Sequence, residues 1–194
     1  GMVMEIGCVV MAAGNARRFG ENKLAATVAG RTLAQRALDA VPADLIRRVA
    51  VVTQYQEVAE LARARGFLPL KNAHPDWGIS HTIRLGTQAL GDCDGILYLV
   101  SDQPLLTREA VARVVRTWLE DPTRIAAAGH AGVRGNPCLF PREFFPELLR
   151  LREDRGGNTV IRAHQDRLVL AEVPAAQLTD VDTPEALKKL EIQR

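Results

Sequence analysis

A basic turn follows the first apolar run of the chain, and its residue types suit phosphate binding. The run Ile6–Met11 ends at the turn Ala12–Gly14, and the cations that follow it are Arg17, Arg18 and Lys23. Glycine lets backbone N–H groups approach a phosphate closely, and cationic side chains neutralise its charge. The glycine spacing matches neither the dinucleotide pattern GxGxxG nor the P-loop pattern GxxxxGK[ST]. Taken alone, the turn is typical both of an unusual phosphate loop and of a solvated basic turn.

Carboxylates lie at two later positions where strands or extended segments end. Asp102 lies two residues after the apolar run Ile96–Val100. Asp180 and Asp182 precede a helix start at Thr183, and in extended backbone they lie on the same side because side chains alternate with a period of two. Carboxylate oxygens suit a hard cation such as Mg²⁺. Each aspartate is also typical of a turn or a helix cap, and that alternative stays open.

Together, the basic turn and the carboxylates supply the groups that bind a phosphate and a metal ion. Cations hold phosphate oxygens, carboxylates hold Mg²⁺, and the metal bridges to the phosphates. The set therefore predicts phosphoryl or nucleotidyl transfer without deciding between them.

The elements that must position these residues alternate along the chain up to Gly129. The patterns predict buried strands at Ile6–Met11, Val49–Thr53, Ile96–Val100 and Ile125–Ala128. They predict helices at Thr32–Val41, Val58–Arg65, Ser80–Leu90 and Arg108–Leu119. Such alternation indicates an α/β fold, a three-layer α/β/α Rossmann-like arrangement with a mostly parallel sheet. Sheets of this kind bind ligands beyond the carboxyl ends of their strands, where the turn and Asp102 are expected.

After Gly129 the alternation weakens. The segment GVRGNPCLFP carries turn residues before a short apolar run, FPELLRL has a helical pattern, and EDRGGN reads as a polar loop. A short helix at Thr159–His164 and a strand at Leu168–Val173 are expected beyond it. Insertions into one sheet domain explain this region better than a second domain, so we expect a single domain over residues 1–194.

Composition excludes several classes of protein. The net charge of +2 and the lack of a long Lys/Arg block argue against a nucleic-acid partner. No apolar stretch approaches the ~20 residues of a membrane-spanning helix. The cysteines are far apart and form no CxxC pair, which argues against a disulfide framework or a zinc site. We expect a cytoplasmic protein.

With these residues in place, the sequence resembles the nucleotidyltransferases of the nucleotide-diphospho-sugar transferase type. MAAGNARRFGENK resembles the signature LAAGxSxRMGxxK, and SDQP resembles GDQP. The segments that resemble later motifs of the family, in the same order, are WGISHTIRLG, GNPCLFPREFFPELLRL, EDRGGN and DVDTPEAL. The most similar branch is the molybdenum-cofactor cytidylyltransferases, with relatives that serve xanthine dehydrogenase-type enzymes.

The resemblance implies a nucleotide-binding half at residues 1–129. Its expected nucleotide-binding residues are Ala12, Ala13, Gly14, Asn15, Arg18, Lys23 and Ser80. Gly14 and the neighbouring amides are expected to cradle a triphosphate, which Arg18 and Lys23 neutralise. Relatives that use GTP carry AGG where this chain has AAG, so the resemblance favours CTP.

The resemblance also implies a metal site and an acceptor side. Asp102 is expected to ligate Mg²⁺, with Mn²⁺ as the alternative ion, and Asp180 or Asp182 to supply a second carboxylate. Residues 130–194 are expected to hold the acceptor side and this closing carboxylate motif. The expected acceptor-side residues are Pro137, Leu139, Phe140 and Asp154. The expected catalytic residues are Arg18, Lys23 and Asp102.

Two departures from the family pattern fall on the loop and on the acceptor side. Ala16 replaces the usual Ser, which removes a hydroxyl from the loop. EDRGGN lacks the Gly expected before Asp154, and Asn158 stands where the family has Arg. The acceptor is therefore the part of the assignment that the motifs define least.

The implied reaction is transfer of CMP from CTP to the terminal phosphate of molybdopterin cofactor, with release of pyrophosphate. A molybdoenzyme client or a maturation chaperone is the implied partner. Two alternatives stay open: another phosphate monoester as acceptor, such as a phosphosugar or a phosphocholine-like compound, and a non-catalytic protein that delivers nucleotide or cofactor.

Overall fold

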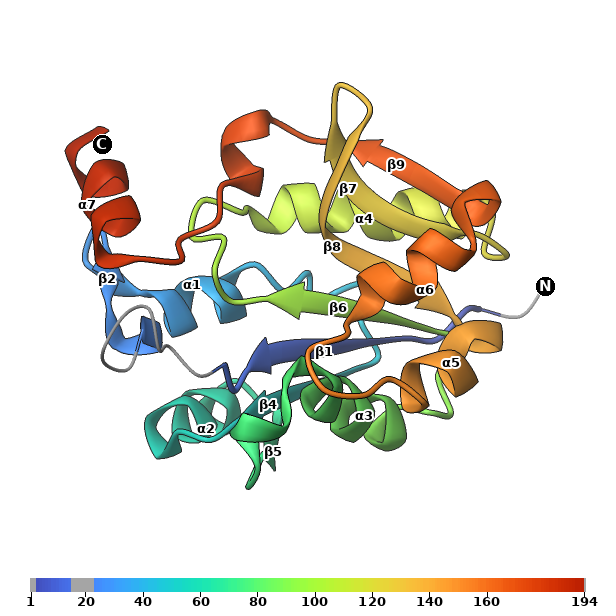
Figure 1. Ribbon diagram of the computed structural model, residues 1–194, viewed down its shortest axis with the longest axis horizontal. Helices are drawn as coiled ribbons and strands as arrows, with labels where there is room; N and C mark the ends of the chain where they lie inside the picture. The colour runs from blue at the N-terminus through green and yellow to red at the C-terminus, as the bar shows by residue number, and fades with distance from the viewer. Residues whose placement is uncertain (1–2, 15–22, 194) are drawn as a thin grey trace.

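The computed structural model describes residues 3–14 and 23–193, and its centre is a seven-stranded sheet (Figure 1). The strand order is β5-β4-β1-β6-β8-β7-β9. The strands are β1 Ile6–Ala12, β4 Arg48–Thr53, β5 Leu68–Lys71, β6 Gly95–Val100, β7 Ile125–His130, β8 Val133–Pro141 and β9 Leu168–Glu172. Within this sheet β8 alone runs against its neighbours. The short strands β2 (Thr27–Val28) and β3 (Arg31–Thr32) pair separately.

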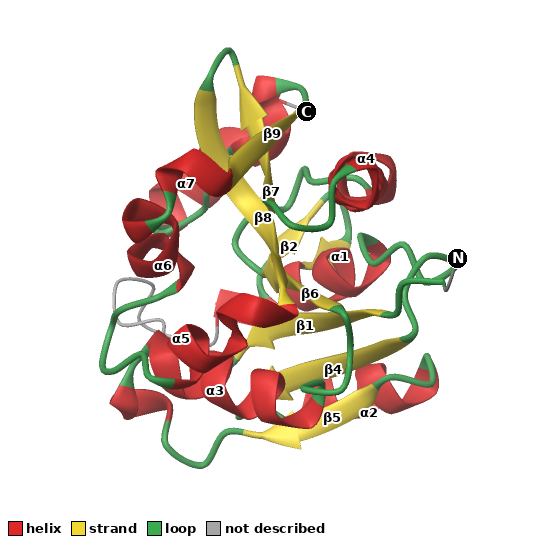
Figure 2. Ribbon diagram, turned by 90° about the vertical axis from the view of Figure 1, so that its right-hand side faces the viewer, coloured by secondary structure: helices red, strands yellow, loops and turns green. Residues whose placement is uncertain are grey.

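Helices cover both faces of the sheet, which confirms the predicted three-layer α/β/α arrangement (Figure 2). The helices are α1 Leu33–Asp39, α2 Gln56–Ala64, α3 Ile79–Ala89, α4 Arg108–Glu120, α5 Phe145–Leu149, α6 Gly157–Ala163 and α7 Pro184–Gln193. Helices α1, α2 and α4 pack on one face, and α3, α5 and α6 pack on the other. In the described part of the chain, no helix combines the length and apolar character needed to cross a membrane.

The strands divide their side chains between two cores because successive residues point to opposite faces. Cys8 and Val10 of β1 lie in the core beneath α1 and α4, whereas Val9 lies in the core beneath α3. Gly86 of α3 lets that helix approach β1 closely, because a Cβ at Gly86 would lie 2.6 Å from the Val9 side chain. The start of α3 is thereby held beside the carboxyl end of β1.

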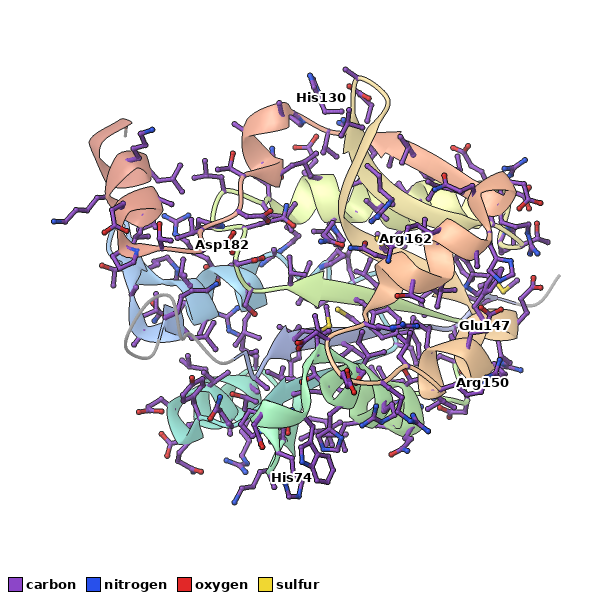
Figure 3. All side chains as sticks on the ribbon, in the orientation of Figure 1. His74, His130, Glu147, Arg150, Arg162 and Asp182 are labelled. Carbon is purple, nitrogen blue, oxygen red and sulfur yellow. The ribbon has the colours of Figure 1, made fainter. Side chains whose placement is uncertain are left out.

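Most of the predicted elements are present, and the differences are strands that the patterns missed, on both sides of Gly129. Of the expected turn at GVRGNP, only Gly132 lies in a turn, that of the β7–β8 hairpin whose tip lies near His130 (Figure 3); residues 133–137 belong to the nine-residue strand β8. At that tip Ala131 and Gly132 adopt positive φ angles of 51° and 82°. The sequence patterns also miss β5, a short strand that contains Pro69 and lies at the sheet edge, where a missing N–H is tolerated.

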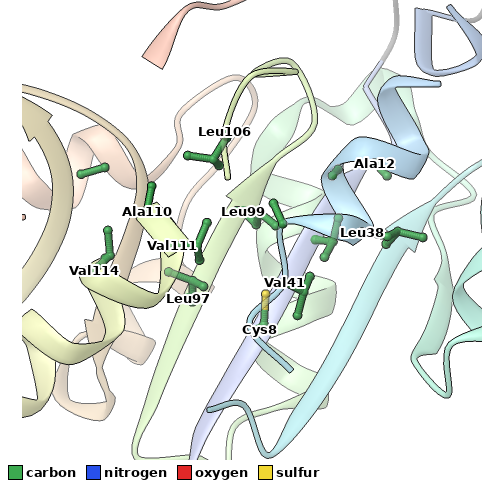
Figure 4. Close-up of a cluster of buried hydrophobic side chains, with 14 of the residues drawn as sticks. Cys8, Ala12, Leu38, Val41, Leu97, Leu99, Leu106, Ala110, Val111 and Val114 are labelled. Atoms are coloured by element: carbon green, nitrogen blue, oxygen red, sulfur yellow. The ribbon is translucent and has the colours of Figure 1, made fainter. Parts of the chain in front are cut away.

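The core beneath α1 and α4 anchors the strands that lead to the turn and to Asp102. Leu97 and Leu99 of β6 pack there with Val111 of α4 and with Cys8 (Figure 4). All four side chains are fully buried, so β1 and β6 have little freedom to shift relative to each other. The residues that follow these strands therefore extend from a rigid base.

Candidate active site

A cavity of about 500 Å³ lies where β1 and β6 end. Of the sequence-predicted residues, those that line it are Ala12, Ala13, Gly14, Lys23, Asp102 and Asp154. Asn15 and Arg18 lie outside the described residues. The structure thus places the turn, a cation and the strand-end carboxylate around one space.

Side chains that follow β4 and β6, the strands on either side of β1, hold the end of β1 and the Ala12–Gly14 turn in place. The Ser101 hydroxyl donates to the Met11 carbonyl at 2.7 Å, and the Gln54 amide donates to the Ala13 carbonyl at 3.0 Å. The Tyr55 hydroxyl donates to the Gly14 carbonyl at 3.4 Å. Two of these bonds occupy carbonyl groups of the turn, and the bond from Ser101 occupies the carbonyl group just before it. Sequence reasoning missed all three donors, although each directly follows a strand, as Asp102 does.

A backbone hydrogen bond brings the two carboxylate segments together. The Val181 N–H donates to the Asp102 carbonyl at 2.8 Å. Val181 is fully buried, so Asp180 and Asp182 both point away from the core on the opposite side of the extended segment. Figure 3 shows Asp182 on the side of the sheet where β1 and β6 end. The predicted common orientation of the pair agrees with this geometry.

The carboxylates and Lys23 are close enough to change one another's ionisation. Burial, followed by the carboxylate of Asp182, raises the pKa of Asp102 above its ordinary value, and Lys23 opposes the rise. Partial burial and then the carboxylates of Asp102 and Asp182 raise the pKa of Asp180 to about 6. The site therefore concentrates negative charge that a cation would stabilise.

The oxygen donors fit a divalent cation that is also held by its substrate. In residues 3–14 and 23–193, no three His, Cys, Asp or Glu side chains converge on a point that could hold a metal by themselves. Mg²⁺ usually keeps several waters and binds through one or two carboxylates plus substrate phosphates, so it needs no closed protein cage. Asp102, Asp180 and Asp182 are hard oxygen donors of the kind that this ion prefers.

Ser80 does not line the cavity. It is fully buried, and its hydroxyl accepts a hydrogen bond from Arg84 at 3.0 Å. Its neighbours Ile79 and Thr82 line the cavity instead, and the buried Asn72 amide donates to the Thr82 hydroxyl at 2.9 Å. The motif therefore reaches the site through the residues on either side of Ser80.

The expected acceptor-side residues separate into two groups. Phe140 and Asp154 line a second cavity of about 150 Å³, which adjoins the first. Leu139 is fully buried on the opposite face of β8, where it packs with Trp118 of α4. It cannot contact an acceptor there, because alternation along the strand points it away from both cavities. Pro137 is buried in β8 and lines neither cavity.

Gly78 holds the loop that carries Asp154 against the start of α3. A Cβ at Gly78 would lie 2.2 Å from the Glu153 carbonyl oxygen and 2.8 Å from the Asp154 carboxylate. The Ser80 N–H donates to that same Glu153 carbonyl at 3.1 Å. The wall shared by the two cavities therefore depends on a close backbone approach.

Comparison with known proteins identifies relatives along nearly the whole chain. The MobA-like NTP transferase domain model matches residues 8–168. The purine catabolism protein PucB of Bacillus subtilis (strain 168) is 27% identical over 191 residues, which cover 91% of each chain.

Solved structures show the same fold. Rv0371c of Mycobacterium tuberculosis H37Rv superposes with a TM-score of 0.81 at 22% identity, covering 99% of this chain and 100% of that one. A nucleotidyl transferase from Methanothermobacter thermautotroptrophicus gives a TM-score of 0.81 at 21% identity, covering 97% of each chain. Rv0371c has also been solved in complex with manganese.

Proposed function

Because the chain belongs to the MobA-like NTP transferase domain family, we propose that it transfers CMP from CTP to the terminal phosphate of a molybdopterin cofactor. The observation that carries the proposal is the single cavity around the Ala12–Gly14 turn, Lys23 and Asp102. The turn presents backbone and a cation to a triphosphate, and the carboxylates suit a metal that binds the same phosphates.

The reaction needs no strong base in the protein. An oxygen of the acceptor phosphate attacks the α-phosphorus of CTP, the bond to the α–β bridging oxygen breaks, and pyrophosphate leaves with that electron pair. A phosphate monoester has a second pKa of about 6 and is largely ionised at neutral pH. The protein therefore contributes mainly position and charge neutralisation.

The charged and polar residues in and around the cavity have specific roles in this scheme. Lys23 neutralises the triphosphate, and the bonds from Gln54 and Tyr55 hold the turn that meets the nucleotide. Asp102 holds Mg²⁺ with Asp180 or Asp182, and Mn²⁺ is the alternative ion, as bound by the fold relative Rv0371c. When bound, the metal stabilises the charge that develops on the phosphate oxygens.

The choice of nucleotide and acceptor rests on sequence motifs and on a relative. The AAG turn favours CTP, and the molybdenum-cofactor cytidylyltransferases resemble this chain over most of its motifs. PucB is named as a purine catabolism protein. A molybdoenzyme of the xanthine dehydrogenase type acts on a purine, which agrees with such an enzyme as the client.

A matrix of nucleotides and acceptors tests the proposal. CTP, GTP and UTP are each combined with molybdopterin cofactor, a hexose phosphate and phosphocholine, with Mg²⁺ or Mn²⁺, and pyrophosphate release is measured. The expected result is release with CTP and molybdopterin cofactor that stops when EDTA is added. Faster pyrophosphate release with a phosphosugar would identify the phosphosugar, and not molybdopterin cofactor, as the acceptor. Tight CTP binding without pyrophosphate release from any pair would favour a non-catalytic delivery protein.

A further inference from the structure

Arg134 is a cation whose charge no carboxylate neutralises within the described residues. Its Nη2 donates to the Asn158 side-chain oxygen at 2.7 Å, and its Nη1 lies 3.9 Å from the Cys138 sulfur. Other arginines nearby in sequence are paired differently: Arg142 binds Asp94, and Arg167 binds Glu143. A neutral amide orients the Arg134 guanidinium and leaves its positive charge available for a ligand.

The position of Arg134 on β8 directs it to the cavity side of the sheet. Alternate residues of a strand share one face, so Arg134 shares a face with Asn136, Cys138 and Phe140. These three residues line the second cavity, and Asn158 of α6 lines it as well. Since Arg134 contacts both Cys138 and Asn158, it extends this row at the edge of the cavity.

The second cavity shares one wall with the nucleotide cavity. The residues that line both are Met11, Ile79, Val100 and Asp154. The Asp154 carboxylate on this shared wall repels an anion, whereas Arg134 attracts one at the β8–α6 side. An anionic group of a second substrate that lies between the two cavities is therefore best stabilised on the side that faces Arg134.

The sequence gives an independent reason to look at this pair. Asn158 stands where the family pattern has an arginine, in the loop EDRGGN. In the structure, a guanidinium from a different element, β8, binds the Asn158 side chain. A positive charge is thus present beside position 158, although residue 158 does not supply it.

We propose that Arg134, oriented by Asn158, binds the phosphate monoester of the acceptor. The inference rests on the proposed nucleotidyl transfer for the identity of the anion. A guanidinium presents parallel N–H donors that match two oxygens of a phosphate, and such charge-assisted bonds are stronger than neutral ones. Arg134 acts here as a binding residue for the second substrate and leaves the nucleotide to Lys23.

The test measures binding directly and does not need turnover. Phenyl phosphate is titrated into the full chain by calorimetry, with the nucleotide cavity filled by a CTP analogue whose α–β bridge is a methylene group. Arg134→Gln is expected to weaken phenyl phosphate binding about 10- to 100-fold and to leave the affinity for the CTP analogue unchanged. Arg134→Lys is expected to lose less affinity for phenyl phosphate than Arg134→Gln, because it keeps the positive charge. It should still bind more weakly than wild type, because lysine lacks the paired donors of the guanidinium.

Two further variants sharpen the test. Asn158→Ala, which frees the guanidinium to reorient, is expected to weaken phenyl phosphate binding about threefold. Arg116→Gln is the matched control, because it removes the same charge from an exposed position of α4 on the other face of the sheet. Thermal unfolding of each variant shows whether the fold is intact.

The outcomes separate this inference from the proposed function. If wild-type protein does not bind phenyl phosphate, or if Arg134→Gln binds it as tightly as Arg116→Gln does, the inference is wrong. If the CTP analogue does not bind while phenyl phosphate binding still depends on Arg134, the proposed cytidylyl transfer is wrong and the anion site stands.

Discussion

The two walls of the candidate site are built in different ways. The nucleotide wall follows β1 and β6, which are central parallel strands with fully buried side chains on both faces. The acceptor wall comes from the antiparallel strand β8, the short helix α6 and the loop that carries Asp154. The first wall is fixed by regular elements, whereas the second depends on contacts between segments that are far apart in the sequence.

This difference in construction indicates which wall of the site tolerates changes of sequence and which does not. A turn at the end of a central strand has its position set by the sheet, so it suits the part of the substrate that all reactions of a family share. Loops and hairpins tolerate sequence change more readily, and specificity commonly resides there. The departures at residues 153–158 fall on the acceptor wall, as this division would predict.

The largest expected effect comes from the nucleotide wall. Replacing Asp102 with Ala removes the strand-end carboxylate and should lower kcat for metal-dependent pyrophosphate release by about 10²- to 10³-fold, as is typical for loss of one electrostatic group. The variant should stay folded, because burial and Asp182 already disfavour the Asp102 charge. Stopped assays of pyrophosphate release measure kcat, and a melting curve shows whether the variant is folded.

Asp44→Asn serves as the control for this variant. Asp44 is exposed in the loop after α1, away from the cavity residues. It should keep wild-type activity. Full activity in Asp102→Ala would overturn the assignment of the nucleotide wall.

The next effect concerns nucleotide affinity. Lys23 lines the cavity and lowers the pKa of both Asp102 and Asp180 through its charge. Lys23→Gln should weaken CTP binding about 10- to 100-fold, the range for a hydrogen bond to a charged group. Calorimetric titration with CTP measures it, and Lys71→Gln on the exposed end of β5 should have no effect. An unchanged CTP affinity in Lys23→Gln would mean that the triphosphate binds elsewhere in the molecule.

The same division explains how far the sequence predicts the structure. Asp102 and the Ala12–Gly14 turn could be located because the ends of parallel strands meet at one edge of a sheet. Ser101, Gln54 and Tyr55 could not be given their roles, since their hydrogen bonds to the turn exist only after β4 and β6 have paired with β1.

On the acceptor wall the predictions failed for a related reason. Gly132 of GVRGNP lies in the hairpin turn as its type indicates, but pairing with β7 and β6 makes the following residues, Gly135 and Pro137 included, part of a strand. The face on which Leu139 lies depends on the register of that strand, which local pattern does not reveal. Arg134 was not singled out, because its partner Asn158 is 24 residues away in the sequence.

A smaller effect tests the close approach that holds the acceptor wall. Gly78 has φ 91° and ψ 174°, a region that only glycine occupies readily, and a Cβ there would overlap the Glu153 carbonyl. Gly78→Ala should lower the free energy of unfolding by about 3 kcal/mol, a fall in Tm of about 6–12 °C.

Gly30→Ala isolates the contribution of the contact. Gly30 also has a positive φ, 82°, but a Cβ there would have no atom within 4 Å. Gly30→Ala should therefore lower the free energy of unfolding by only about 1 kcal/mol. Differential scanning calorimetry of both variants gives the difference, and equal losses would mean that the approach of the 153–154 loop contributes nothing beyond backbone strain.

The smallest effect concerns charge repulsion where the two walls meet. Burial and the carboxylates of Asp102 and Asp182 raise the pKa of Asp180 to about 6, above the ~3.9 of an unfolded chain. A raised carboxyl pKa means that the folded state binds the proton more tightly, so stability falls as the pH rises from about 4 through 6.

Asp180→Asn removes that loss and should be more stable than wild type at pH 8 without metal, yet equal to it near pH 4. Because the Asp180 side chain is only partly buried and still faces water, solvent screening keeps the gain below about 1 kcal/mol, or roughly 1–3 °C in Tm. Mg²⁺ should abolish the advantage by stabilising the wild-type carboxylates, while the exposed Asp166→Asn should show no pH-dependent gain at all. A gain that persists unchanged at pH 4 would show that Asp180 destabilises the fold by something other than its charge.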